Sequence, residues 1–150
     1  MLSLLTIATT TVVGLMVGVE LAVAVVLNRI VLRLPAGASI AARADSARML
    51  GGVMPFWYVG SLLLTVALTA FTWGTAAATG VVLAAALLAI SVVMSVVFLV
   101  PINNRSAAWT AESHPADWRE QYRKWDRLHY LRVAIIVVAF VLVVAAVTAQ

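Results

Sequence analysis

The long uncharged stretch between Arg48 and Arg105 constrains the fold of this chain more than any other feature. A helix needs about 20 apolar residues to cross the hydrocarbon core of a bilayer, so this stretch is long enough for two such helices. The segment Gly74-Thr-Ala-Ala-Ala-Thr-Gly80 in its middle is typical of a turn. The sequence therefore predicts a membrane hairpin, with helices over about residues 53–73 and 79–100.

Two further apolar runs complete the predicted architecture. The first covers about residues 4–27, and the second forms the last part of a helix predicted over 115–149. The first run lacks the basic start of a signal peptide, so we expect it to remain as a helix. With 64% hydrophobic and 11% charged residues and a mean hydropathy of +1.07, the chain is predicted to be all-α, one domain (1–150) of four transmembrane helices.

Basic residues predict the orientation of this bundle. All ten lie in two loops predicted over residues 28–52 and 101–129, or at Arg132 just beyond the second loop. Because basic loops face the cytoplasm, both loops are predicted to be cytoplasmic and both termini to lie outside. We therefore expect a multi-pass protein of a bacterial-type inner or plasma membrane, whose basic residues meet the lipid bilayer and not nucleic acid.

The first of these loops is predicted to be a solvated linker. It breaks at Leu34-Pro35-Ala36-Gly37, because proline cannot extend a helix. An alanine-rich stretch over residues 39–50 then predicts a short interfacial helix, with Arg43, Asp45 and Arg48 in water. No chemistry is assigned to this segment.

Glu20 is the one charged side chain in the first apolar run. A charge near the middle of a spanning helix costs about 2.5 to 3.5 kcal/mol on insertion scales, so such residues usually face a bundle interior and take part in a function or an ion pair. Met16 lies one turn deeper on the same helical face. Glu20 is therefore predicted to have a partner inside the bundle.

The fourth helix carries the most distinctive pattern in the chain. Five residues at alternating spacings of four and three share one of its faces: Trp118, Tyr122, Trp125, His129 and Arg132. Such a stripe is often packing, with aromatic rings closing the end of a bundle and an arginine reaching toward water. Its polar end, however, places an imidazole and a guanidinium where packing alone would favour leucines.

Two adjacent asparagines, Asn103 and Asn104, follow Pro101 at the end of the third helix. Asparagine is a common helix C-cap because it tolerates the left-handed conformation. Its side-chain amide also offers a donor and an acceptor to a ligand or to Glu20. Both interpretations stay open at this point.

Together these patterns predict one cytoplasm-facing cavity within the bundle. Its polar lining is expected to come from three helices: Glu20, Asn103, His129 and Arg132. The backbone of Glu20 lies about 12 Å inside the end of its helix, a gap that long side chains on the opposite-running fourth helix can bridge. Trp109 or Trp125 is expected to cap the cavity, with Met16 as part of its apolar floor.

These features resemble the anthrone-oxygenase-like membrane proteins. The resemblance rests on four spans, a polar residue in the first, Pro-x-Asn-Asn at the end of the third, and Trp125-x-x-x-His129-x-x-Arg132 leading into the fourth. It covers essentially the whole chain. It implies an oxidoreductase, specifically a monooxygenase that uses dioxygen to oxidise a flat, hydrophobic aromatic molecule, as in the conversion of an anthrone to an anthraquinone.

The predicted cavity fits that chemistry. Loss of a proton from the acidic methylene of an anthrone gives an electron-rich anion that reacts with dioxygen, so a base and an anion stabiliser are needed. Glu20 or His129 would be the base, and Arg132 would stabilise the developing oxyanion. The expected substrate-binding residues are aromatic or carry an amide: Asn103, Asn104, Trp109, Tyr122 and Trp125.

A cofactor-dependent redox protein is an alternative prediction. An oxidation by dioxygen alone needs no resident cofactor, but His129 would also serve as a haem ligand. A single metal ion would take His129, Glu20 and Met16 as a thin, mixed ligand set. The chain has no cysteine and only two histidines, so the sequence predicts no dedicated metal site.

A non-enzymatic membrane protein is the third prediction. There, Glu20 and Arg132 would form a structural pair, or a proton relay in a small transporter or assembly partner. The pattern Gly14-x-x-x-Gly18 favours close helix packing, either within the chain or between the subunits of a homo-oligomer.

Overall fold

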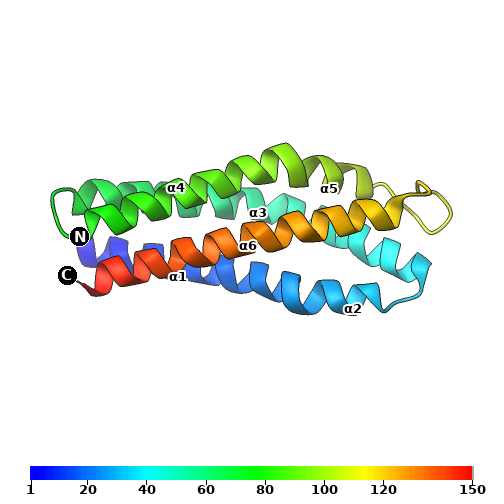
Figure 1. Ribbon diagram of the computed structural model, residues 1–150, viewed down its shortest axis with the longest axis horizontal. Coiled ribbons are helices and arrows are strands. Elements are labelled where there is room, and N and C mark those ends of the chain that lie inside the picture. The colour runs from blue at the N-terminus through cyan, green and yellow to red at the C-terminus, as the bar shows by residue number, and fades with distance from the viewer. Residues whose placement is uncertain (150) are drawn as a thin grey trace.

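The computed structural model describes residues 1–149, and every regular element in this range is helical (Figure 1). Two of the helical segments are π-helical, and the order along the chain is α1 (Leu2–Ala22), η1 (Val23–Leu27), α2 (Asn28–Leu32), α3 (Ala36–Thr72), α4 (Ala78–Met94), η2 (Ser95–Leu99), α5 (Val100–Ser106) and α6 (Trp118–Thr148). Adjoining segments merge into four long helices, Leu2–Leu32, Ala36–Thr72, Ala78–Ser106 and Trp118–Thr148. Each is long and apolar enough to cross a membrane, which confirms the predicted four-helix architecture.

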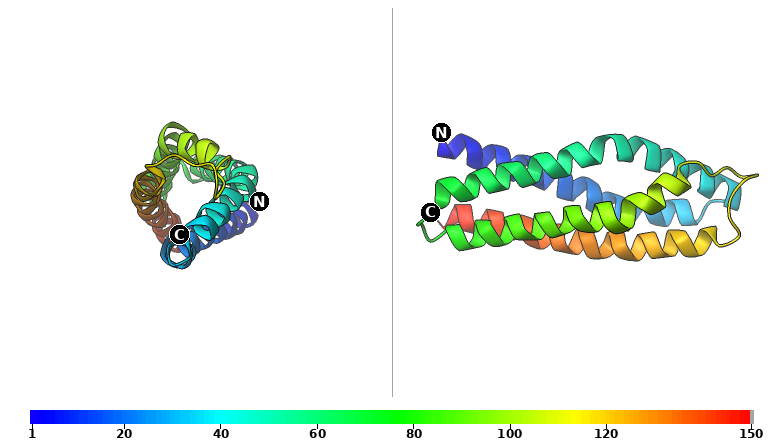
Figure 2. Two further views of the ribbon diagram at one scale, coloured as in Figure 1. Left: turned by 90° about the vertical axis from the view of Figure 1, so that its right-hand side faces the viewer. Right: turned by 90° about the horizontal axis from the view of Figure 1, so that it is seen from above.

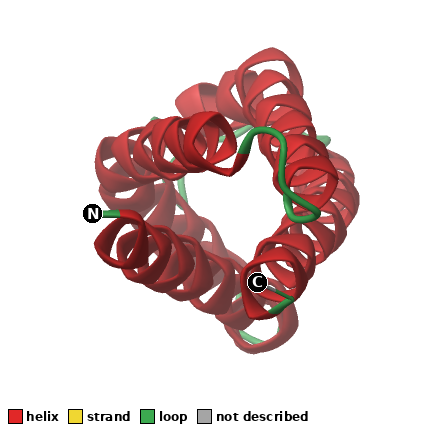
Figure 3. Cartoon of the chain, turned by 90° about the vertical axis from the view of Figure 1, so that its left-hand side faces the viewer, coloured by secondary structure: helices red, strands yellow, loops and turns green. Residues whose placement is uncertain are grey.

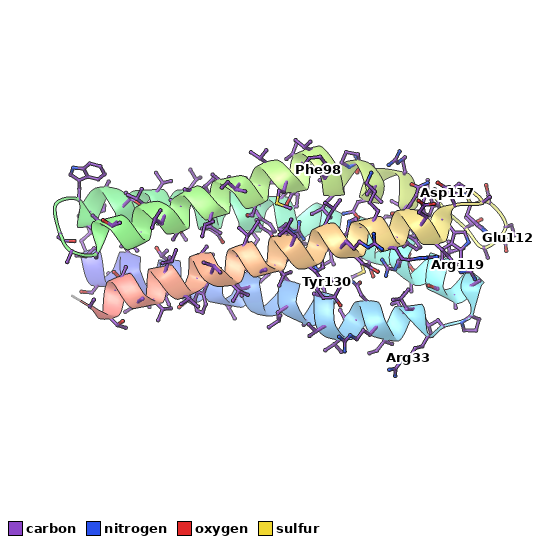
Figure 4. The ribbon with its side chains drawn as sticks, in the orientation of Figure 1. Arg33, Phe98, Glu112, Asp117, Arg119 and Tyr130 are labelled. Atoms are coloured by element: carbon purple, nitrogen blue, oxygen red, sulfur yellow. The ribbon has the colours of Figure 1, made fainter. Side chains whose placement is uncertain are left out.

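The four long helices form a four-cornered antiparallel bundle (Figures 1 and 3). α1 packs against α3 and α6, and α4 packs against the same two helices. Both termini lie at one end, and the connections α2–α3 and α5–α6 lie at the other, which we call the loop end (Figure 1). Figure 4 shows Arg33, Glu112, Asp117 and Arg119 at the loop end. This segregation of charge agrees with the predicted topology, and the side of the membrane that the loop end faces stays a prediction.

Two buried apolar clusters hold the bundle together. The larger cluster has fully buried members from all four long helices, among them Val13, Met16, Leu68, Leu88 and Ile136. The smaller cluster lies at the loop end and consists of Ile40, Trp118 and Tyr122, with Trp109 packed against it. The candidate functional cavity lies between these two clusters.

The helices extend well past the apolar runs, which corrects the predicted first loop. The sequence predicts a loop over residues 28–52, but α2 continues the first helix to Leu32 and α3 begins at Ala36. The short helix expected over 39–50 is therefore the first part of α3. At 1.5 Å per residue, α3 is about 55 Å long, against a hydrocarbon thickness of about 30 Å. The length of an apolar run indicates the thickness of the bilayer and not the ends of the helix. A helix makes its own backbone hydrogen bonds, so it can continue into water.

The second predicted loop, over residues 101–129, is also shorter in the structure. The third long helix continues to Ser106, and α6 begins at Trp118 and not near residue 115. Asp117 is the N-cap residue of α6, although its side chain makes no capping hydrogen bond. The non-helical connection is thus confined to residues 107–117.

Two local distortions shape the long helices beside the cavity. The π-helical segment η2 comes directly before α5, which carries Pro101 in its first turn. A proline lacks the N–H of a regular helix, and its ring clashes with the carbonyl four residues earlier, here that of Val97. Pro55 lies inside α3, and Figure 2 (right) shows α3 bowing away from α4 before it approaches α5. The wider, π-helical turn of η2 is a feature that often occurs at functional sites.

Two glycines allow close contacts between long helices. A Cβ atom on Gly14 would lie 3.0 Å from the Phe140 ring on α6, whereas one on Gly18 would meet nothing within 4 Å. The Gly14-x-x-x-Gly18 pattern thus serves packing inside the bundle at its first position only. On α4, a Cβ atom on Gly80 would lie 3.0 Å from Cβ of Ala146 and 3.5 Å from the carbonyl oxygen of Leu142.

The contact at Gly80 predicts a clear effect on stability. Replacing Gly80 with leucine is expected to lower the free energy of unfolding by about 1–3 kcal/mol, because the side chain would force α4 away from the backbone of α6. Gly60→Leu is the matched control, since a Cβ atom there meets nothing within 4 Å. Unfolding of detergent-solubilised protein measures both variants, and equal stability of the two would contradict the packing at Gly80.

Candidate active-site cavity

A cavity of about 270 Å³ lies inside the loop-end half of the bundle, and all four long helices contribute to its wall. This volume is just below the range of about 300–1,000 Å³ that is common for small-molecule sites. Most of the wall is apolar, with side chains such as Val23, Met54 and Leu99. The polar lining is therefore a small set of side chains at defined positions, as expected for a site that orients an apolar ligand.

The deepest polar group is a triad of Glu20, His129 and Arg132, all buried. Arg132 Nη2 donates to Glu20 Oε2 at 2.7 Å and lies 3.0 Å from His129 Nδ1. Its other terminal nitrogen, Nη1, donates to the hydroxyl of Ser95 at 2.8 Å. Oε2 of Glu20 lies 3.3 Å from His129 Nδ1. The carboxylate thus has the cationic partner that its insertion cost demands.

Nδ1 of His129 has two neighbours of opposite character. The Arg132 guanidinium, 3.0 Å away, can only donate to Nδ1, and the Glu20 carboxylate, 3.3 Å away, can only accept from it, so each tautomer of the imidazole satisfies one of the two contacts. Nε2 is buried and has no hydrogen-bond partner among the described residues. The same is true of Arg132 Nε. Two hydrogen-bonding groups beside the Glu20 carboxylate are therefore available to a ligand.

Aromatic rings hold this triad in place. The Trp125 ring stacks on the imidazole of His129, with centroids 4.6 Å apart and planes 17° from parallel. The guanidinium carbon of Arg132 lies 5.0 Å from the centroid of the Tyr58 ring. A cation over an aromatic face is stabilised by the ring quadrupole, so Tyr58 helps to keep Arg132 charged and oriented.

A second ion pair borders the cavity nearer the loop end. Arg43 of α3 donates from both terminal nitrogens to the two carboxylate oxygens of Asp126 on α6, each at 2.9 Å. Its guanidinium also lies 4.6 Å from the centroid of the Tyr122 ring. The prediction that Arg43 is solvated is wrong: it is buried, because α3 continues alongside α6 instead of ending in a loop.

Seven of the eight site residues predicted from the sequence line the cavity: Glu20, Asn103, Asn104, Tyr122, Trp125, His129 and Arg132. The predicted convergence of the carboxylate, imidazole and guanidinium is confirmed by their contacts. Trp109 is not part of the lining. Its ring packs on that of Tyr122, with centroids 5.3 Å apart, so it supports the cavity from behind.

Other residues that the sequence does not indicate also line the cavity, including Asn28, Arg43, Tyr58 and Ser95. Tyr58 and Ser95 lie in uncharged spans, where a single hydroxyl gives little signal. The contact of Ser95 with Arg132 joins residues 37 positions apart. Tyr58 could have been indicated only by working out which face of α3 is buried, since the buried positions of this helix include Tyr58 and Ser61.

The donor set does not fit the predicted metal-ion alternative. Met16 is fully buried in the larger apolar cluster, where Ser61 Oγ lies 3.5 Å from its sulfur, and it does not line the cavity. The remaining candidates, Glu20 and His129, share the Arg132 guanidinium. A cation would have to displace that guanidinium or bear its repulsion. Haem would need Nε2 of His129 and a larger space than about 270 Å³.

Comparison with known proteins identifies one family. The family model described as anthrone oxygenase matches residues 52–142, which include Asn103, His129 and Arg132 but not Glu20. Comparisons with curated proteins and with solved structures find no match. Since the family model covers more than half of the chain, including the polar end of the α6 stripe, this protein belongs to the anthrone oxygenase family.

Proposed function

We propose that this protein oxidises a flat, hydrophobic, anthrone-like molecule with dioxygen inside the cavity. The observation that carries the proposal is the polar triad in an otherwise apolar wall: Glu20 is held by Arg132, and His129 Nε2 and Arg132 Nε are left unpartnered beside it. A base next to two buried donors is the apparatus needed to form and stabilise an enolate-type anion. Membership of the anthrone oxygenase family supports the same reaction class.

In the proposed reaction His129 has its hydrogen on Nε2, the tautomer in which Nδ1 accepts from Arg132. In this tautomer Nε2 cannot accept a proton from substrate. Glu20 is therefore the base that removes a proton from the substrate methylene. His129 Nε2 and Arg132 Nε donate to the carbonyl oxygen as it becomes an oxyanion. Trp125 lines the same cavity and offers an aromatic face to a flat substrate.

The oxidation can be written with dioxygen as the only oxidant. The substrate anion forms a carbon–oxygen bond to dioxygen, and protonation of the distal oxygen gives a hydroperoxide. Loss of the second proton from the same carbon, with cleavage of the O–O bond, forms the new carbonyl and releases water. One anthrone and one dioxygen thus give one anthraquinone and one water. Glu20 would serve both proton removals if it returns its first proton to the peroxide.

The structure supports entry of an apolar substrate from the lipid. α3 packs against α4 and α5, yet within the described residues it makes at most marginal contact with the intervening segment η2. Val59 of α3 and Val96 of η2 both line the cavity and are both exposed on the bundle surface. The exposed valines on these two segments would let a hydrophobic molecule pass between bilayer and cavity with little loss of apolar contact.

A structural role for the triad is the second candidate, and the 2.7 Å contact between Glu20 and Arg132 by itself favours it equally. In that case the pair would neutralise two buried charges and do no chemistry. The two candidates differ in what happens to turnover when the pair is replaced by neutral side chains: a structural pair would leave the rate unchanged, and a catalytic pair would not.

The proposed reaction predicts stoichiometric oxygen consumption. Purified protein in lipid nanodiscs, supplied with anthrone, is expected to consume one dioxygen per anthraquinone formed, well above the rate of spontaneous oxidation. An oxygen electrode and the absorbance of the quinone provide the two measurements. Tyr130→Phe is the matched control, since Tyr130 lies outside the cavity and donates to the carbonyl oxygen of Ala24. A rate equal to that of empty nanodiscs would refute the proposal for this substrate.

A further inference from the structure

Four side chains that line the cavity each carry a buried polar atom that has no partner among the described residues and no role in the proposed reaction. These atoms are Asn28 Nδ2, Arg43 Nε, the Tyr122 hydroxyl and Trp125 Nε1. A buried donor left without a partner costs about 1–3 kcal/mol, so native structures seldom retain several in one place. Their concentration in a single cavity points to a ligand that completes them.

These four atoms belong to residues that form a layer closer to the loop end than the triad. Trp125 and Tyr122 precede Arg132 by seven and ten residues, which places their backbones about 10 and 15 Å along α6. Asn28 follows Glu20 by eight residues, about 12 Å in the same direction, because α1 and α6 are antiparallel. A ligand that reaches from the triad to this outer layer must be long and must carry hydrogen-bonding groups at both ends.

The chemistry of the outer layer selects the kind of group. The free N–H groups of Asn28, Arg43 and Trp125 only donate, so the ligand must present an acceptor. The charge of Arg43 is already matched by its two-pronged contact with Asp126. A carboxylate at this position would therefore place a second negative charge beside Asp126 with no unpaired cation to balance it. An uncharged oxygen satisfies the donors without that repulsion.

We propose that the outer layer is a specificity subsite for an uncharged oxygen, a hydroxyl or carbonyl, on the outer ring of the substrate that points toward the loop end. The inference rests on the proposed function in so far as the ligand is a flat polycyclic ketone. Tyr122 and Trp125 are the specificity-determining residues that can be tested most cleanly. A phenylalanine at position 122 removes only the hydroxyl, and a phenylalanine at position 125 removes the Nε1–H while an aromatic ring remains.

Binding of three anthraquinones tests the subsite without any turnover. Wild-type protein is titrated with anthraquinone, 2-(hydroxymethyl)anthraquinone and anthraquinone-2-carboxylate, and tryptophan fluorescence reports binding. The hydroxymethyl compound is expected to bind roughly threefold to tenfold more tightly than anthraquinone, the gain of one or two hydrogen bonds. The carboxylate is expected to bind no better than anthraquinone.

The variants then locate the preference. Tyr122→Phe and Trp125→Phe are each expected to reduce the preference for the hydroxymethyl compound, and together to abolish it. The preference is the ratio of two affinities measured in the same variant, so a change in the affinity for anthraquinone itself does not count toward it. Tyr130→Phe, on the same helix but outside the cavity, is expected to keep the full preference. A preference that survives the double variant, tighter binding of the carboxylate, or no preference in the wild type would each overturn the subsite.

The failure of the proposed function would be recognised separately. If wild-type protein prefers the hydroxymethyl compound but does not oxidise anthrone, the subsite stands and the oxidation is wrong. If anthrone is oxidised without any preference among the three quinones, the oxidation stands and the subsite is wrong.

Discussion

Replacement of Arg132 with methionine is expected to be the most destabilising single change in the cavity. Methionine keeps much of the volume of the side chain but leaves the Glu20 carboxylate buried without its partner at 2.7 Å. Breaking a buried pair from one side typically costs about 3–5 kcal/mol, because the remaining charge is uncompensated. The hydrogen bond to Ser95 is lost as well. The free energy of unfolding in mixed detergent micelles measures the effect.

The double variant Glu20→Gln/Arg132→Met is the control for this prediction. Removing both charges is expected to restore most of the stability lost in Arg132→Met, since neutral side chains carry no desolvation cost of a charge. If the double variant is as unstable as Arg132→Met, the loss comes from packing and not from the orphaned carboxylate. A stable double variant that still oxidises anthrone at the wild-type rate would show that the triad is structural only.

Glu20→Gln is expected to reduce turnover by about 10²–10⁴-fold, the usual contribution of a positioned general base. The amide keeps the shape of the carboxylate and an oxygen that accepts from Arg132, so stability should fall less than in Arg132→Met. The guanidinium that remains is still covered by the Tyr58 ring and hydrogen-bonded to Ser95. Steady-state oxygen uptake with anthrone gives the rate constants.

A separate measurement distinguishes loss of the base from loss of the fold. The affinity of Glu20→Gln for anthraquinone is expected to stay within a few-fold of wild type, so the defect should appear in kcat and not in binding. His129→Gln provides the comparison, because it removes a donor and the Trp125 stacking partner but leaves the carboxylate. If Glu20→Gln keeps most of its turnover while His129→Gln loses it, the base has been assigned to the wrong residue.

The deep half of the site was predictable from the sequence because its residues violate local rules. A carboxylate in an apolar run must have a partner, and the helical spacing of His129 and Arg132 brings both to one face of α6. With antiparallel helices, little freedom remained in how these groups could meet. The family resemblance drew on the same residues, and the family match includes both of the α6 residues.

The outer half of the site was not predictable, for a different physical reason. Arg43 lies in a segment whose composition matches a solvated linker, and its partner Asp126 is 83 residues away in the chain. Nothing local indicates that α3 continues along α6 at this point. The position of Trp109 likewise depends on the path of the connection 107–117, which follows from turn geometry more than from a hydrophobic pattern.

Because α3 and α6 continue beyond the apolar runs, the cavity would extend across the boundary between the bilayer and the aqueous phase. Dioxygen and apolar aromatics both concentrate in hydrocarbon, so the two reactants of the proposed oxidation would be supplied from the same phase, past Val59 and Val96. Protons and water would be exchanged at the other end, near Asn104, which is exposed and lines the cavity. The triad would thus receive dioxygen and the apolar substrate from the bilayer, and exchange protons and water with the aqueous phase.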